Sequence, residues 1–129
     1  MARIWVNGTF DIIHRGHLEL LNYASSYGLV RVGLDTDDRV KQFKGDSRPI
    51  NLLEDRIYLM QNIKSVDSVV SFSSDEELEE RIREWQPEYI IIGSDYKHKM
   101  VIGRHLVKDV IFFDRIEGYS STEKMNKMR

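Results

Sequence analysis

Two histidines three residues apart, His14 and His17, carry the clearest chemical signal in the sequence. They flank Gly16 in the stretch NGTFDIIHRGH, between an apolar run and a segment with helical periodicity. At the start of a helix, residues three apart project to the same side, so both imidazoles could reach one phosphate. The free N–H groups of a helix amino end also attract anions. The alternative, that these rings only satisfy hydrogen bonds in the core, is less favoured for a pair with an intervening glycine than for a lone histidine.

Asp11 lies in the same stretch, and its role stays open at this stage. The carboxylate could bind a metal ion, orient a histidine or cap the turn. A zinc site built on the two histidines would need a third ligand, and none has convincing spacing.

A second group of candidate residues is cationic. The segment DDRVKQFKGDSRP, residues 37–49, carries Lys41, Lys44 and Arg48 and ends in a proline, which disfavours helix at the residue before it. We expect a mobile basic loop here.

Arg56 is the unusual residue of the next predicted helix, residues 52–63, whose start we assign to Asn51 and Glu54 as an N-cap pair. At about 100° per residue, Arg56 falls on the apolar face of this helix. An arginine that points inward needs an anion, so we expect it to face a ligand. The alternatives are that it reaches the rim or pairs with a core carboxylate.

The surrounding elements indicate how these residues meet. Apolar runs predict strands over residues 3–6, 29–34, 67–72, 88–92 and 110–113, separated by mainly helical segments. This alternation predicts an α/β fold, a three-layer, Rossmann-like structure with a five-stranded parallel sheet. Ligands bind at the carboxyl ends of such strands. The histidine turn, the basic segment, the turn from Gly93 to Tyr96 and the segment 115–122 should therefore share one edge.

Length and charge limit the function classes. The 129 residues indicate a single domain over 1–129, and the net charge of −2 argues against a nucleic-acid partner. No apolar run approaches the roughly 20 residues that span a bilayer, and no signal pattern opens the chain, so we expect a cytoplasmic protein without a membrane partner. The absence of cysteine excludes disulfides and thiol catalysis.

Two motifs also carry a resemblance. NGTFDIIHRGH resembles the HxGH signature of the cytidylyltransferase-like nucleotidyltransferases, and RIEGYSST resembles their RxEGxSTT element. Within that superfamily, KGDSRPINLLEDR, VVSF and GSDYK are similar to the heptose 1-phosphate adenylyltransferase domain of ADP-heptose synthase. The compact length and the arginine of RIEG are also similar to glycerol-3-phosphate cytidylyltransferase. Where that heptose enzyme has GGDY, this chain has GSDY, which leaves the choice of base open.

The resemblance implies attack by an acceptor's phosphate oxygen on the α-phosphorus of a nucleoside triphosphate, with Mg²⁺ assistance and release of pyrophosphate. ATP with heptose 1-phosphate is the first expectation for the substrates, and CTP with glycerol 3-phosphate is the alternative. A nucleotide-binding module without turnover is a rival of another class, marked by loss of a histidine or of the basic segment, and neither is lost here. A symmetric homodimer is the default assembly.

The resemblance also implies roles by motif position. The catalytic residues would be His14, His17, Lys44 and Arg115. The acceptor or its phosphate would meet Arg56, Arg48 and Lys41. Mg²⁺ would be held mainly by the triphosphate, with Asp11 as a candidate ligand. The nucleotide would be bound by Gly8, Thr9, Phe10, Asp11, Gly16, Gly93, Asp95, Tyr96, Gly118, Ser120, Ser121 and Thr122.

Overall fold

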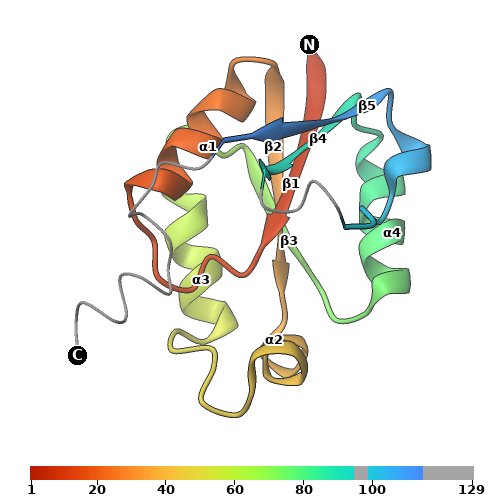
Figure 1. Cartoon of the computed structure of the whole chain (residues 1–129). Coiled ribbons are helices and arrows are strands. Elements are labelled where there is room, and N and C mark those ends of the chain that lie inside the picture. Colours follow the sequence, from red (N-terminus) through yellow and green to blue (C-terminus); the bar gives the residue numbers. More distant parts are fainter. Residues whose placement is uncertain (95–98, 115–129) are drawn as a thin grey trace.

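A five-stranded parallel sheet with the order β3-β2-β1-β4-β5 forms the centre of the protein (Figure 1). The computed structural model describes residues 1–94 and 99–114. Its strands are β1 (Ala2–Gly8), β2 (Gly28–Asp35), β3 (Ser68–Phe72), β4 (Tyr89–Gly93) and β5 (Asp109–Phe113). Its helices are α1 (Arg15–Ser25), α2 (Asp37–Lys44), α3 (Leu53–Gln61), α4 (Asp75–Trp85) and the short 3-10 helix η2 (Arg104–Leu106). The predicted α/β sheet is confirmed.

The strand order reverses direction between β1 and β4, which makes this pair the topological switch point of the sheet. The chain builds outward from β1 through β2 to β3, then returns to place β4 on the other side of β1. Connections that diverge from two neighbouring strands leave a gap at their carboxyl ends, which is where Rossmann-like folds bind ligands. The histidine turn follows β1, and Gly93 ends β4, so the two predicted ligand turns leave the sheet from adjacent strands.

Alternate side chains of β1 fill two separate cores. Ile4 and Val6 lie in a buried cluster with α1 and α3, whereas Trp5 joins a second cluster with α4 and β5. Figure 1 shows α1 and α3 on one face of the sheet and α4 on the other. The predicted three-layer arrangement is therefore confirmed.

The prediction of a loop over residues 37–49 is wrong for its first half, because residues 37–44 form helix α2. Acidic residues occupy its first turn and lysines its last, which complements the helix dipole. Val40 is its buried anchor, and Gly45 ends it with a φ of 92°. Lys44 therefore stands at a helix carboxyl end, and the loop proper runs over residues 45–52.

The predicted start of the following helix also needs correction. The N-cap of α3 is Leu52, whose side chain makes no capping bond. Asp37 of α2 instead accepts a hydrogen bond from the Leu53 backbone N–H at 2.9 Å. Asn51 is drawn away from capping because its side-chain amide donates to the Asp11 carbonyl at 2.6 Å.

Within the described residues, no helix has the length and apolar character needed to cross a membrane.

Candidate functional site

The two histidines form the amino end of α1. His14 is the N-cap, and its Nδ1 accepts a hydrogen bond from the Gly16 backbone N–H at 3.1 Å. The Nδ1 of His17 accepts from the His14 backbone N–H at 3.3 Å. The rings stack with centroids 3.9 Å apart and an interplanar angle of 24°. The predicted projection to one side of the helix start is thus confirmed, and it takes the form of a reciprocal capping box.

These bonds assign the tautomer of both rings. A backbone N–H is always a donor, so the Nδ1 of His14 and of His17 must each present a lone pair. A neutral imidazole that accepts at Nδ1 carries its proton on Nε2. In this geometry both rings accept at Nδ1, so Nε2 is the nitrogen that carries the ring N–H.

Phe10 supports this pair from the turn before the helix. Its φ of 48° lies in the left-handed region, which a bulky side chain rarely adopts. The ring is 6% exposed, and it meets the His17 ring edge-on at a centroid distance of 5.2 Å. Gly8, at the end of β1, makes room for this ring, because a Cβ there would come within 3.1 Å of it. The strained turn thus fixes the orientation of His17.

Asp11 is buried at 2% exposure and binds the loop after α2. One carboxylate oxygen accepts from the Ile50 backbone N–H at 2.8 Å, and the other accepts from the Asn51 backbone N–H at 2.7 Å. The guanidinium of Arg48 lies 3.7 Å from the same carboxylate. These bonds tie the turn to a loop 39 and 40 residues away in sequence, a role that is not among the alternatives named from the sequence.

Arg56 points inward as predicted, but its partners are protein groups. The side chain is 0% exposed, and its guanidinium forms an ion pair of 2.8 Å with Asp37. It also donates to the carbonyls of Thr9 at 3.0 Å, Asp35 at 2.8 Å and Asn51 at 3.0 Å. The expectation of a ligand-facing arginine is corrected here. The structure shows instead a pair with the partly exposed Asp37 carboxylate, and four protein acceptors in total occupy the guanidinium.

Several acidic residues at this edge were missed as site components. Asp35 ends β2, accepts from the Thr9 hydroxyl at 3.4 Å and pairs with Arg39 at 2.8 Å. Arg39 also reaches Asp75 at 2.8 Å, which ties α2 to the start of α4. The available signal was position, since Asp35 and Asp37 directly follow an apolar strand at the ligand edge.

Lys44 lies near this charged cluster. Partial burial lowers the pKa of Lys44 below its ordinary value of 10.5, and the neighbouring Arg48 lowers it further, against the opposing effect of Asp35 and Asp11. Part of the residue remains open to solvent, so an incoming anion can reach it. Lys41, one turn earlier on α2, is exposed. The end of α2 therefore carries a lysine with a lowered pKa, and a bound anion would raise that pKa again.

The structure thus brings together a large part of the predicted site. The turn from Gly8 to His17 and the loop of Arg48 meet through Asp11 at the carboxyl edge of the sheet, and Gly93 lies at the end of the strand beside β1. The remaining predicted residues lie outside the described part of the chain: Asp95, Tyr96, Arg115, Gly118, Ser120, Ser121 and Thr122.

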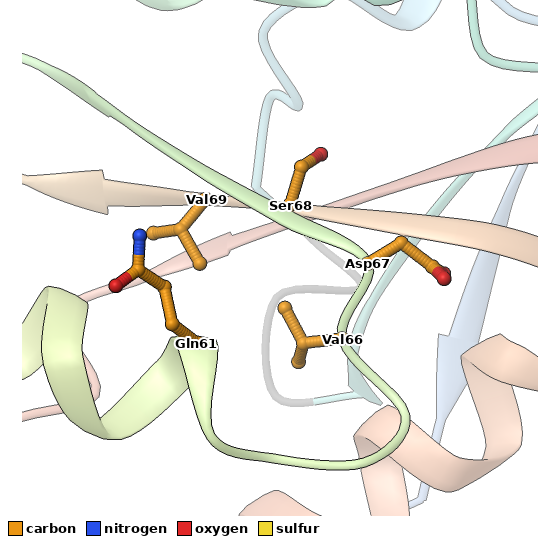
Figure 2. Close-up of a pocket in the computed structure, with 5 residues that line it drawn as sticks. All are labelled: Gln61, Val66, Asp67, Ser68 and Val69. Carbon is orange, nitrogen blue, oxygen red and sulfur yellow. The ribbon is translucent and has the colours of Figure 1, made fainter.

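A shallow hollow of about 260 Å³ lies elsewhere, at the amino end of β3 (Figure 2). Its lining consists of Gln61, Val66, Asp67, Ser68 and Val69. None of these side chains is cationic, and the strand end is the one opposite the histidine turn. The hollow therefore does not suit a polyphosphate.

Relatives of known sequence match nearly the whole chain. The chain is 42% identical over 120 residues to the bifunctional protein HldE of Helicobacter hepaticus, covering 92% of this chain and 25% of that protein. It is 41% identical over 127 residues to the protein of the same name from Nitratiruptor sp., covering 98% of this chain and 27% of that protein. The chain thus spans about a quarter of the length of these relatives.

Solved structures support the fold. A lipopolysaccharide core biosynthesis protein from Thermoplasma volcanium aligns with a TM-score of 0.70 at 24% identity, covering 93% of this chain and 99% of the other. At this identity, the likeness shows the fold alone. The family model described as cytidylyltransferase-like matches residues 5–124. This match covers the histidine turn, the loop over residues 45–52 and the strands β1 and β4, and the chain therefore belongs to the cytidylyltransferase-like family.

Proposed function

We propose that the protein transfers a nucleoside monophosphate from a nucleoside triphosphate to a sugar or polyol phosphate and releases pyrophosphate. The observation that carries the proposal is the pair of stacked imidazoles at the amino end of α1, each of which accepts a backbone N–H at Nδ1. In the proposal, the Nε2 sides of the rings serve one anionic group, beside a helix end that itself favours negative charge. An α-phosphate in transfer is such a group.

In the proposed reaction, an oxygen of the acceptor's phosphate attacks the α-phosphorus. The new P–O bond forms as the bond between the α-phosphorus and the bridging oxygen breaks, and pyrophosphate leaves with the electron pair. His14 and His17 stabilise the charge on the non-bridging oxygens, and they need no proton transfer to do so. Lys44 and Arg48 neutralise phosphate charge from the opposite side. Arg115, Ser120, Ser121 and Thr122 are assigned to the triphosphate by motif position only.

Mg²⁺ belongs to this proposal as an ion carried by the triphosphate, where it neutralises charge on the phosphate oxygens. Within the described residues, no group of three or more His, Asp or Glu side chains is arranged to hold a metal ion. Both oxygens of Asp11 are engaged by backbone N–H groups. The donor set therefore fits an ion bound mainly through its nucleotide.

The proposed substrates are ATP and a heptose 1-phosphate. The segments that resemble the heptose 1-phosphate adenylyltransferase lie within the region matched by the HldE relatives, at 37% identity or more. CTP with glycerol 3-phosphate is the second candidate, favoured by the cytidylyltransferase-like family model. The proposed setting is the cytoplasm, and the proposed assembly is a homodimer that would cover the exposed Tyr58 and Leu59 of α3, which sedimentation would test.

The experiment is a matrix of pyrophosphate-release rates, with ATP, CTP, GTP and UTP each offered with a panel of phosphorylated sugars and polyols. The proposal expects turnover with one pair, led by ATP and heptose 1-phosphate. Tight triphosphate binding without turnover in any pair would contradict it and would favour the binding module.

A further inference from the structure

The buried carboxylate of Asp11 makes contacts that the proposed reaction does not use. It binds two successive backbone N–H groups, those of Ile50 and Asn51, with a different oxygen for each. In return, the Asn51 side chain donates to the Asp11 carbonyl at 2.6 Å. The partners are 39 and 40 residues away in sequence, so these bonds close a tertiary link between the histidine turn and the loop after α2.

The same loop is held from its other side by Arg56. That guanidinium donates to the Asn51 carbonyl and to the Thr9 carbonyl, two residues before Asp11. A buried anion and a buried cation therefore bind the same loop to the same turn. Buried charges of this kind hold one geometry, because an N–H or carbonyl that loses its partner inside the protein is costly.

The link reaches groups that would meet substrate. Asp11 precedes His14 by three residues, and its carboxylate lies 3.7 Å from the Arg48 guanidinium. Lys44 stands four residues before Arg48, and its ammonium interacts electrostatically with both Asp11 and Arg48. The carboxylate thus lies between the histidine turn in sequence and the two cations in space.

We propose that Asp11 is a positioning residue, which fixes the loop of Ile50 and Asn51 against the histidine turn and so places Lys44 and Arg48 relative to His14 and His17. It does not act as the metal ligand that its place in the motif also allows. At 2% exposure, with each oxygen bonded to an N–H, the carboxylate leaves a cation little access. The proposal rests on the proposed function.

The test uses Asp11→Asn in the full chain. One oxygen becomes an amide N–H₂ group that faces a backbone N–H, so Ile50 or Asn51 loses its acceptor. The matched control is Asp67→Asn, because the Asp67 carboxylate also accepts a backbone N–H, that of Val30 at 2.7 Å, far from the site. Asn51→Ala is a milder second variant that removes only the return bond and keeps the test decisive if Asp11→Asn does not fold.

Three measurements are compared: amide exchange at Ile50 and Asn51, kcat and KM for both substrates, and the Mg²⁺ concentration for half-maximal rate. In Asp11→Asn, exchange at the two amides should rise, and kcat/KM should fall by about 10²-fold, as for groups displaced by about 1 Å. Half-saturation by Mg²⁺ should stay within about twofold. In Asp67→Asn, the thermal midpoint should fall without loss of kcat/KM. Asn51→Ala should follow Asp11→Asn in direction with a smaller size.

A double variant separates positioning from direct contact. In the Asp11→Asn background, adding Lys44→Met should cost less than about threefold in kcat/KM, because the ammonium is already misplaced. The proposal would be overturned if the kcat/KM losses of Asp11→Asn and Lys44→Met multiply in the double variant and the Mg²⁺ concentration for half-maximal rate rises tenfold or more in Asp11→Asn. Unchanged exchange at Ile50 and Asn51 would also overturn it. Amide exchange needs no turnover. It therefore tests the bonds from Asp11 to Ile50 and Asn51 even if no substrate pair releases pyrophosphate.

Discussion

Two helix starts, those of α1 and α4, both use side chains of the first turn to accept backbone N–H groups, but the side chains and the donors differ. In α4, the Ser74 hydroxyl accepts from the Glu77 N–H at 3.0 Å, and the Glu77 carboxylate accepts from the N–H of Ser73, the residue before the N-cap, at 2.8 Å. In α1, the Nδ1 of His14 accepts from the Gly16 N–H, and the Nδ1 of His17 accepts from the N–H of the N-cap residue, His14. An imidazole has two nitrogens, so a ring that caps with one still has a second. A serine hydroxyl or a glutamate that caps has no such second ring nitrogen, and this is the difference between the two helix starts.

A third start, that of α3, extends the comparison. Its N-cap, Leu52, makes no side-chain bond, and Asp37 and Arg56 supply the polar contacts from the tertiary structure. Stability at α4 should therefore depend on a local cap, and stability at α3 on a buried ion pair. At α1, substitutions of the capping histidines should change the reaction rate more than the stability.

The largest expected effect on stability belongs to Arg56→Met. It leaves Asp37 without its buried cation and three carbonyls without their donor, which should lower the free energy of unfolding by about 3–5 kcal/mol. Urea unfolding measures it. Arg31→Met is the control, since Arg31 stacks on Trp85 with its Cζ 4.0 Å from the ring centroid and should cost about 1 kcal/mol. Equal losses would contradict a special role for the buried pair.

Substitutions that keep an acceptor for the helix cap but remove Nε2 separate the capping role of the histidines from their proposed role at the phosphate. In His14→Asn and His17→Gln, a side-chain oxygen can replace Nδ1 as acceptor, whereas the Nε2–H is lost. The pyrophosphate-release rate should fall by about 10²-fold or more, with little change in triphosphate affinity or thermal midpoint. A matched loss of affinity in a binding titration would indicate a ground-state role instead.

Lys44 should support activity while slightly lowering the stability of the fold. Because burial lowers its pKa below 10.5, folding carries a cost at neutral pH that starts to fall as the pH rises through the lowered pKa and is gone only above 10.5. Lys44→Met should therefore be at least as stable as the parent at pH 7, while its rate falls by about 10- to 100-fold, as for one charged hydrogen bond.

The pH profile provides the control for this residue. The parent's rate should decline on the alkaline side, at a pH below the ordinary lysine value, as the ammonium loses its proton. Lys44→Arg stays charged and should extend the active range upward. Identical alkaline limbs for parent and arginine variant would show that another group controls that limb.

The smallest effect is expected at the conventional cap. Ser74→Ala should cost about 1 kcal/mol of stability and leave pyrophosphate release unchanged, because α4 starts away from the histidine turn. Thermal unfolding and the standard rate assay measure both. A rate loss comparable to that of the histidine variants would remove the contrast between the two helix starts.

The sequence predicted the strands and the histidine turn because their signals are local. Buried parallel strands are continuous apolar runs, as in Ile90 to Ile92, and a glycine between two histidines marks a turn with chemistry. Helix α2 was missed because its polar sequence has one buried residue, Val40, and its capping charges resemble an ordinary basic loop.

The partners of Asp11 and Arg56 could not be predicted for a different reason. Apart from the Asp37 and Arg48 side chains, they are backbone groups of Ile50, Asn51, Thr9 and Asp35, and a backbone N–H or carbonyl has no identity in the sequence. The inward direction of Arg56 was readable from helical periodicity. The acceptor it meets depends on the tertiary contact between two strand ends and a loop.

The most direct measurement is a single-turnover rate of pyrophosphate release for the parent and for His17→Gln, at triphosphate concentrations that saturate both. The parent should turn over ATP with heptose 1-phosphate, and His17→Gln should be slower by about 10²-fold or more at equal triphosphate occupancy. Equal rates at equal occupancy would contradict the assignment of the stacked imidazoles to the α-phosphate.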